Sequence, residues 1–372
     1  MIYLDNSATS FYKPDSVKKE IIEAINKYTA NPGRGSYDLS REVALKINQA
    51  RENAQLIFGK NFNCIFCSGC SFALNLAIMG SVRQGSHVIT TYLEHNSVLR
   101  VLEHLKQQGF IEYTILFDLD KENIIKNIRK NTTTLITNHI SNVTGEVVDI
   151  NLFSNICKNY NLTYILDTAQ SAGHIQADFE KADIIAFAGH KGLMGLSGCG
   201  GLMIKNKIKL KPIIFGGTGH QSLNLTQPND YPEGFEVGTI STIPIISLSA
   251  GIEYFIKNKQ YILEKEKNLT NYLITKLQSL KFIKLYSNPN NCNGVVAFNI
   301  AHFDSGLIGD ILNDEYNICV RTGYQCAPMV HKKLKTENQG VVRASISFEN
   351  SFDEIDIFIN ALKSIYDSLT KM

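Results

Sequence analysis

Two short stretches near the middle of the chain carry the clearest indication of its architecture. They are TYILDTAQ at residues 163–170 and IIAFAGHKG at residues 184–192. Each begins with an apolar run of strand length and ends in polar or glycine residues, among them Asp167 in the first and Lys191 in the second. Runs of this kind predict buried strands that end at one edge of a sheet.

The same pattern extends in both directions along the chain. Segments with helical periodicity alternate with short β-rich runs, which predicts an α/β fold whose mostly parallel sheet is flanked by helices. In such sheets, ligands bind beyond the carboxyl ends of the strands. The helical segments are residues 16–28, 40–58, 96–108, 122–130 and 152–160, and the seven β-rich runs are residues 64–67, 87–91, 112–116, 133–139, 163–166, 184–188 and 201–204.

The rhythm changes after residue 205. Residues 206–240 are rich in Gly and Pro, which predicts irregular loop. A long helical stretch follows over 245–281, with a break near 257–260 as the alternative to one continuous helix, then strands at 295–300 and 341–345 and a closing helix over 353–369. We therefore expect a large domain over 15–245 and a smaller α/β domain formed by 1–14 and 246–372.

Composition excludes several classes of protein. The chain has 372 residues, 44% of them hydrophobic, and a formal net charge of +2, so it can bury a large core but offers no basic surface for nucleic acid or anionic lipid. No apolar run has membrane-spanning length, and the first residues do not resemble a secretory signal. Eight Cys without such a signal indicate reduced thiols, hence a cytoplasmic protein.

Asp167 and Lys191 together suggest a cofactor. Taken singly, an Asp after a strand is usually a turn cap and a Lys is usually solvated. A carboxylate and a lysine from neighbouring strand ends are nevertheless what pyridoxal 5'-phosphate requires: the lysine amine bonds to the cofactor aldehyde, and the carboxylate keeps the pyridine nitrogen protonated. The pair therefore predicts a site for this cofactor.

Other polar residues follow strands as well. Ser68-Gly69-Cys70-Ser71 lies between a strand and a helix, where backbone N–H groups can cradle a phosphate, although a simple N-cap would look the same. His95 also follows a strand; it is either a cap or surface residue, or a ring that stacks on a cofactor and exchanges protons.

The cysteines divide into two kinds. The spacing of Cys64, Cys67 and Cys70 could suggest a metal site, which we reject because alternate strand residues face opposite sides and no matching second pair is near. We expect these three to be buried, as well as Cys157, Cys199, Cys292 and Cys319. Cys326 differs, because its loop has Gly, Pro and a nearby Arg; it is either a reactive thiol or a free surface thiol.

Arg343 lies within an apolar run of residues 341–345. It could grip a carboxylate or be a charge on an edge strand, and the local sequence does not choose between the two.

Assembled in order, these motifs resemble the cysteine desulfurase family of class V pyridoxal-phosphate enzymes, over nearly the whole chain. The resemblance implies the fold type I of such transferases, with a seven-stranded sheet. The motifs that carry it are Tyr3-Leu4-Asp5-Asn6-Ser7-Ala8-Thr9, Glu94-His95-Asn96, Ser141-Asn142-Val143-Thr144-Gly145, Asp167-Thr168-Ala169-Gln170, Gly189-His190-Lys191 and Arg321-Thr322-Gly323 with Cys326-Ala327.

The resemblance also implies a role for each motif residue. Lys191 would hold the cofactor and move a proton, Cys326 would accept sulfur, and His95 would stack on the ring. Arg343, Arg321 and Asn142 would lie at the substrate. The cofactor-binding residues would be Cys70, Ser71 and His190 at the phosphate, Asp167 at the pyridine nitrogen, Gln170 and Asn142 at the phenolic oxygen, and Gly238 with Thr239 reaching the phosphate of a partner subunit.

The reaction implied by the family converts L-cysteine to L-alanine and leaves a persulfide on Cys326 for transfer to an acceptor. The short spacing from Cys326 to Arg343 resembles the short-loop branch, which usually relies on a dedicated protein acceptor, and the shared site implies a homodimer. Selenocysteine lyase, another class V aminotransferase or lyase, and a non-catalytic binding protein stay open as alternatives.

Some positions depart from the family pattern. Ala188 stands where Ser or Thr is typical, Cys70 replaces a typical Thr, and Tyr324-Gln325 replaces His-His. The segment 31–35 keeps Arg34 but has Gly where relatives often carry His. We expect these changes to affect substrate choice more than cofactor use.

Overall fold

A seven-stranded sheet forms the centre of the protein, whose computed structural model describes residues 1–33 and 35–371. The strand order is β2-β8-β7-β6-β5-β3-β4. Only β8 runs antiparallel to its neighbours, β2 and β7, so the predicted mostly parallel sheet of seven strands is confirmed. The strands are β2 (Phe62–Cys67), β3 (Ser86–Thr91), β4 (Ile111–Leu116), β5 (Thr132–Asn138), β6 (Thr163–Asp167), β7 (Ile184–Ala188) and β8 (Gly200–Lys205).

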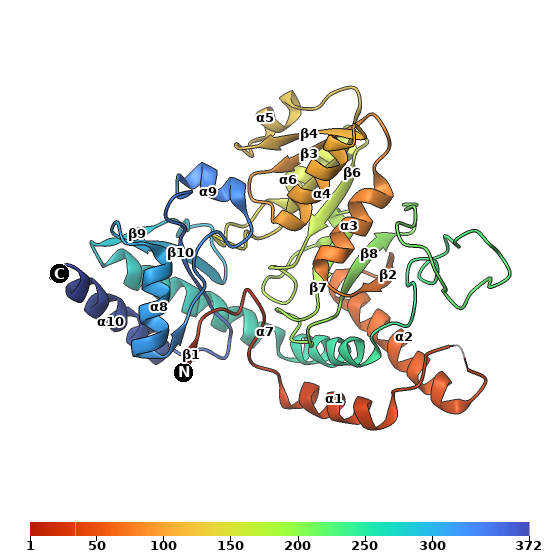
Figure 1. Cartoon of the computed structure of the whole chain (residues 1–372), viewed down its shortest axis with the longest axis horizontal. Helices are drawn as coiled ribbons and strands as arrows, with labels where there is room; N and C mark the ends of the chain where they lie inside the picture. The colour runs from red at the N-terminus through yellow and green to blue at the C-terminus, as the bar shows by residue number, and fades with distance from the viewer. Residues whose placement is uncertain (34, 372) are drawn as a thin grey trace.

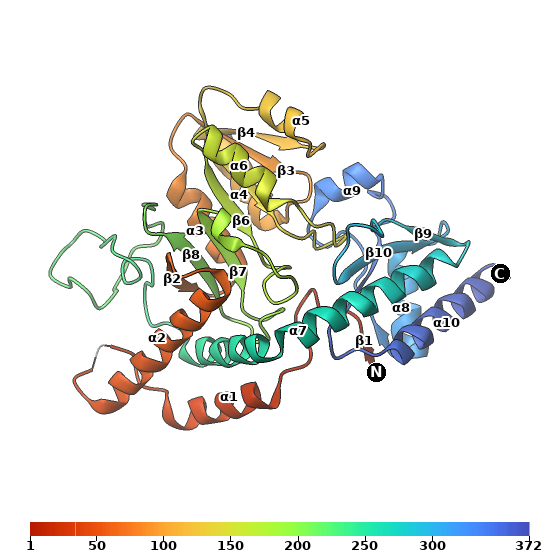
Figure 2. The ribbon, with the colours of Figure 1, turned by 180° about the vertical axis from the view of Figure 1, so that it is seen from behind.

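Helices bury both faces of this sheet. In β6, Tyr164 and Leu166 belong to one hydrophobic cluster and Ile165 to another, because successive strand residues face opposite sides. This is why the central strands are apolar throughout. Figures 1 and 2 show the sheet and its helices from opposite sides. The helices are α2 (Asp38–Phe58), α3 (Cys70–Ser81), α4 (Asn96–Gln107), α5 (Lys121–Lys126) and α6 (Ile150–Asn159), with a 3₁₀ turn, η1 (Phe179–Lys181).

The C-terminal part builds a second core around a three-stranded antiparallel sheet of order β12-β10-β9. Phe298, Ile308 and Leu362 lie in its hydrophobic cluster. The chain start returns here, since β1 pairs with β11 in parallel. The elements are β1 (Ile2–Tyr3), β9 (Ile283–Leu285), β10 (Val295–Ile300), β11 (Ile318–Cys319), β12 (Val342–Ser345), α8 (Ser305–Tyr316), α9 (Pro328–Leu334) and α10 (Phe352–Leu369).

One long helix, α7 (Thr242–Gln278), joins the two parts and lies beside α1 (Asp15–Lys27), as Figures 1 and 2 show. The alternative of a break near residues 257–260 is wrong. Residues 252–278 contain neither Gly nor Pro, and apolar residues such as Ile252 and Leu273 pack into the core on either side of that point. The domain boundary proposed at 245/246 falls in the first turn of α7, and the division into two domains stays a prediction.

The segment between β8 and α7 has no helix or strand, as expected, and extends away from the body of the molecule (Figure 1). The predicted helix over 122–130 is wrong at its end, because α5 stops at Lys126 and the Asn127 side chain bonds to the carbonyl of Asn123. None of the helices within residues 1–33 and 35–371 combines the length and apolar character that crossing a lipid bilayer requires.

Candidate active site

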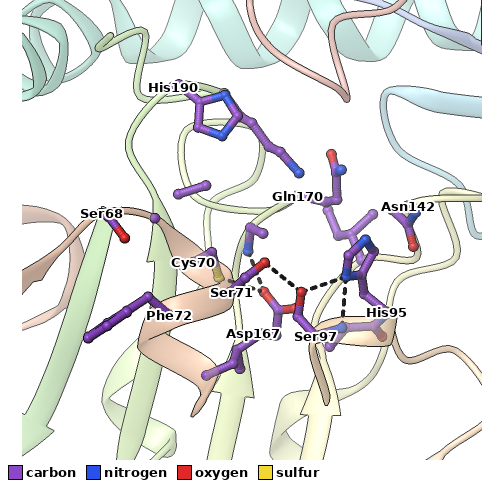
Figure 3. Close-up of a pocket in the computed structure, with 17 residues that line it drawn as sticks. Ser68, Cys70, Ser71, Phe72, His95, Ser97, Asn142, Asp167, Gln170 and His190 are labelled. Carbon is purple, nitrogen blue, oxygen red and sulfur yellow. Dashed lines mark hydrogen bonds between the residues drawn. The ribbon is translucent and has the colours of Figure 1, made fainter. Parts of the chain in front are cut away.

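A cavity of about 310 Å³ opens at the carboxyl ends of the central strands, where the sheet pattern places ligands. Its volume lies in the usual range for small-molecule sites. Figure 3 shows Cys70, Ser71 and Asp167 on one side of it, His95 and Asn142 on another and His190 above. Eight predicted site residues line this one cavity: Cys70, Ser71, His95, Asn142, Asp167, Gln170, His190 and Lys191.

Lys191 and Asp167 face the cavity from neighbouring strand ends, because β6 pairs with β7. No ion pair joins them within the described part of the chain, and both side chains line the cavity. Burial lowers the pKa of Lys191, although the charge of Asp167 opposes this shift. The burial thus favours the neutral amine, which is the form that can bond to a carbonyl carbon.

The Asp167 carboxylate is held in place by its neighbours. Its Oδ1 accepts hydrogen bonds from Ala169 N at 2.8 Å and from the Cys70 thiol at 3.5 Å. Burial raises the pKa of Cys70, with the negative charge of Asp167 adding to the effect, so this thiol stays protonated and can donate.

Helix α3 begins at the cavity without a side-chain cap. Its first residue is Cys70, preceded by Gly69, and no side chain of a described residue bonds to its first N–H groups as a cap. Strand β8 runs so close that a Cβ added to Gly200 would lie 3.0 Å from Cys70 N. Exposed N–H groups at a helix N-terminus attract anions, and Ser71 adds a hydroxyl that contacts Ser97 Oγ at 2.6 Å.

His95 is both a helix cap and a wall of the cavity. Its Nδ1 accepts from Ser97 N at 3.0 Å and so caps α4. Burial lowers the pKa of His95, although Asp167 opposes the shift. Because Nδ1 accepts, the neutral ring carries its proton on Nε2. The two roles that the sequence offered as alternatives are therefore compatible.

The N-terminal segment completes the wall. Gln170 Nε2 donates to Ser7 O at 3.0 Å, and His190 Nδ1 lies 3.1 Å from Thr9 Oγ1. Burial lowers the pKa of His190 to about 4, and Lys191 acts in the same direction.

Cys326 is exposed and lies in an adjacent groove. The groove and the cavity share Ser71, His95 and Ser97 in their walls, so Cys326 is at the cavity's rim. Gln325 and Cys326 have φ values of 42° and 59°, which few residues other than Gly adopt, and this forms a tight loop. The loop is anchored, since Asn142 Nδ2 donates to Gln325 O at 2.6 Å and Asn96 N donates to Cys326 O at 2.7 Å.

The two predicted substrate-binding arginines do not line the cavity. Arg343 is 2% exposed; it pairs with Asp5 and donates to Asn142 O at 2.9 Å. β12 is an edge strand, as the second alternative expected, but Arg343 is buried there and paired with Asp5 rather than solvated, and burial lowers its pKa. Arg321 is exposed and its N–H donates to Arg343 O at 3.1 Å.

Gly238 and Thr239 do not line this cavity: Gly238 lines a separate one, and Thr239 lines a neighbouring one that shares Ser68 and Phe72 with it. They follow Glu236, whose carboxylate forms two hydrogen bonds with Arg51 at 2.6 and 2.8 Å. Their proposed role concerns a partner subunit and stays a prediction.

Of the cysteines expected to be buried, Cys64, Cys67, Cys157 and Cys199 are buried. The expectation is wrong for Cys70, Cys292 and Cys319, which are only partly buried; Cys70 borders the cavity. Arg34 lies outside the described residues.

Sequence reasoning missed several residues at the site. Phe72, Ser97 and Asn138 also line the cavity, and Asp5 holds Arg343. Asn138 ends β5 beside Asp167, so its position at a strand end was the signal that could have found it. Asp5 could be found only by the return of the N-terminus to β12.

The family model described as Aminotransferase class-V matches residues 2–358. The chain belongs to this family. A probable cysteine desulfurase of Pyrococcus abyssi is 34% identical over 99% of this chain and 95% of its own, and one of Methanothermobacter thermautotrophicus is 31% identical over 98% and 94%.

A solved structure is similar over nearly the whole chain. The structure of a cysteine desulfurase from Thermococcus onnurineus NA1 superposes with a TM-score of 0.91 at 32% identity, covering 99% of this chain and 95% of that one. The predicted membership of the cysteine desulfurase family within class V, and with it the fold type I of pyridoxal-phosphate enzymes, is confirmed.

Proposed function

We propose that this protein is a pyridoxal-phosphate-dependent cysteine desulfurase, which converts L-cysteine to L-alanine and leaves the sulfur as a persulfide on Cys326. The step balances: the Cys326 sulfur bonds to the substrate sulfur, the C–S bond of the substrate breaks with its electron pair left on carbon, and that carbon takes up a proton to give L-alanine. The observation that carries the proposal is the thiol at the rim of a cavity lined by a partly buried Lys191 and a buried Asp167.

The residues present fit the cofactor. The uncapped N-terminus of α3, with Ser71, suits its phosphate, and His95 offers a neutral ring as one wall. The Asn142 Oδ1 atom is buried and has no hydrogen-bond partner among the described residues, as expected of an acceptor reserved for a ligand. When bound, pyridoxal phosphate would supply an electron sink that makes the Cα proton of the substrate acidic.

Cofactor binding, proton transfer and sulfur transfer would be carried out by side chains of this protein. Lys191 Nζ would hold the cofactor and then move the Cα proton, which its burial-lowered pKa favours. Asp167 would face the pyridine nitrogen, and Gln170 and Asn142 the phenolic oxygen. The Cys326 thiolate would attack the substrate sulfur from the rim, held there by the Asn142–Gln325 and Asn96–Cys326 bonds.

Arg343 remains our candidate for the substrate carboxylate. Its Nε is buried and has no hydrogen-bond partner in residues 1–33 and 35–371, so the guanidinium keeps a donor that Asp5 and Asn142 do not use. Arg321 would add positive charge at the outer side. A carboxylate at Arg343 must share the guanidinium with Asp5, which we expect to orient it.

The test compares Cys326→Ala with the wild type, supplied with cysteine and with selenocysteine. We expect the variant to bind pyridoxal phosphate with its visible absorbance intact but to lose at least about 100-fold in alanine formation from cysteine. Mass analysis of the wild type should find one added sulfur on Cys326.

Lys191→Ala provides the second arm of this test and should lose the visible absorbance. Equal alanine release by Cys326→Ala and wild type would reject the desulfurase mechanism. Preference for selenocysteine without use of Cys326 would favour a selenocysteine lyase, and a colourless protein in excess cofactor would favour a binding protein.

The homodimer, the cytoplasmic location and the protein sulfur acceptor also belong to this proposal. A dimer is supported by the resemblance of the Gly238-Thr239 segment to one that reaches a partner's phosphate in the family, and by the finding that neither residue lines the cavity of its own chain. An acceptor is supported by the exposure of Cys326.

A further inference from the structure

Glu94 is a fully buried carboxyl group that the proposed reaction does not use. It is 0% exposed and lies between β3 and α4, directly before His95. A buried carboxyl group normally has an ion-pair partner, and Glu94 has none within 4.0 Å among the described cations. The burial of this carboxyl group therefore needs an explanation other than an ion pair.

Hydrogen bonds connect Glu94 to the end of β5. Its Oε1 accepts from Thr91 Oγ1 at 2.7 Å and from Asn138 N at 3.0 Å. In return, Asn138 Nδ2 donates to Leu93 O at 2.6 Å. The segment that leads into His95 is thus tied to the strand end that borders the cavity.

Two oxygen atoms in this network are left over. Glu94 Oε2 and Asn138 Oδ1 are both buried, and neither has a hydrogen-bond partner in the part of the chain that the structure describes. The Asn138 amide cannot be turned round to correct this, because Leu93 O can only accept and needs the NH₂ group. Asn138 also borders the cavity, but Glu94 is 0% exposed, so an unpaired Oε2 there would be costly.

A single proton on Glu94 would give both unpaired oxygen atoms a hydrogen-bond partner. We propose that Glu94 is held as a neutral carboxylic acid, whose Oε2–H donates to Asn138 Oδ1. Oε1 then keeps its two donors, and every polar atom of the Glu94 and Asn138 side chains has a partner. An ionised Glu94 would leave both oxygens unsatisfied.

The electrostatic surroundings agree with a neutral acid. Burial raises the pKa of Glu94 to about 8, against the lowering effect of the bonds from Thr91 and Asn138, and the negative charge of Asp167 adds to the rise. Tyr164 lies in the same interior, and burial raises its pKa so that it too stays neutral.

The location of Glu94 indicates what the neutral acid does at the site, and this part of the inference rests on the proposed function. Asn138 pairs with Asp167 across β5 and β6, so Glu94 links the strand end carrying Asp167 to the turn carrying His95. The cofactor would lie between these two residues. A neutral link sets their spacing without placing a second negative charge beside Asp167, so Glu94 is a positioning residue.

Infrared spectroscopy tests the protonation directly, without substrate or turnover. At neutral pH the wild-type holoenzyme should show a carboxylic acid C=O band that disappears in Glu94→Gln. Glu146→Gln is the matched control, because Glu146 is a partly buried carboxyl group that accepts from a hydroxyl, Tyr92 OH, and it should leave the band in place. A wild-type spectrum without such a band would overturn the proposal.

Thermal stability and the affinity for pyridoxal phosphate provide a second test. A carboxyl whose folded pKa is raised from about 4.5 to about 8 loses stabilising effect as pH rises through that window, so wild-type Tm should fall relative to Glu94→Gln between pH 5 and pH 9. The Gln amide can donate where the acid does, whereas Glu94→Ala cannot. We expect Glu94→Ala to weaken pyridoxal phosphate binding about tenfold or more and Glu94→Gln much less.

Equal losses in both variants would overturn the neutral acid, because an ionised Glu94 cannot be replaced by an amide without cost. Failure of the desulfurase assay would leave the infrared band and the pH dependence of Tm untouched, so the two proposals can fail separately.

Discussion

Burial moves several titratable groups at and near the cavity toward their neutral forms. It lowers the pKa of Lys191 and of His95, lowers that of His190 to about 4, and raises that of Glu94 to about 8. The cause is the same for each residue, since low-dielectric surroundings disfavour whichever form is charged. A site with few charges of its own leaves Asp167 and the ligand to set the local field.

His139 extends this effect to stability. It is 3% exposed at the end of β5, and burial lowers its pKa to about 4. As pH falls from 6.5 toward 4, the unfolded chain takes up a proton on His139 that the folded chain does not. The free energy of unfolding is therefore highest above pH 6.5 and falls by about 2–3 kcal/mol over this window. We expect the free energy of unfolding of His139→Gln, measured by urea titration, to fall less over this window than that of the wild type. The exposed His104→Gln should match the wild type, and a His139→Gln profile identical to wild type would contradict the account.

At the scale of elements, Arg51 of α2 connects three parts of the chain. Its guanidinium donates to Cys64 O in β2 and to both carboxylate oxygens of Glu236, which also accepts from Phe66 N. The pair is largely buried, with side-chain exposures of 16% and 7%. It therefore anchors the irregular segment just before Gly238 and Thr239.

Removing one partner of this pair should be costly. Arg51→Met leaves the Glu236 carboxylate buried without its cation, and we expect a loss of about 3–5 kcal/mol in the free energy of unfolding. The double variant Arg51→Met with Glu236→Leu should recover much of that loss, because no uncompensated charge remains. Urea titration of both proteins checks this; equal losses in the two would rule out an electrostatic cause.

At the scale of the whole molecule, the segment between β8 and α7 exposes apolar side chains. Phe215 is 73% exposed, and Leu223 and Leu225 are fully exposed. Apolar side chains in one projecting segment suit contact with a second copy of the chain, as the proposed homodimer would require.

This dimer can be tested at Leu225. We expect Leu225→Glu to weaken self-association about tenfold or more, because the interface would bury a charge, and to lower pyridoxal phosphate occupancy along with it. Sedimentation velocity over a range of concentrations measures the change. Ile357→Glu, on the exposed side of α10, is the control and should sediment like wild type. A Leu225→Glu protein as dimeric as the wild type would remove this segment from the interface.

Much of the fold and site was predictable, for local reasons. Apolar runs such as 163–166 and 184–188 define buried strands wherever they occur, and polar residues at their ends gather at one edge of a parallel sheet. Asp167, Lys191 and His95 could thus be placed together from sequence. Boundaries were less predictable: α5 ends early through an Asn side-chain bond, and α7 continues because packing on both sides outweighs polar residues at 257–260.

The sequence by itself determined the alternation of strands and helices, the family and the residues that gather at the strand ends, because these follow from periodicity and from short ordered motifs. Only the tertiary structure decided which atoms pair: that Asp5 holds Arg343, that Asn142 anchors the Cys326 loop, and that Glu94 and Asn138 each keep one unpaired oxygen. Such pairings join residues far apart in the chain, and their energies depend on burial, which no local pattern records.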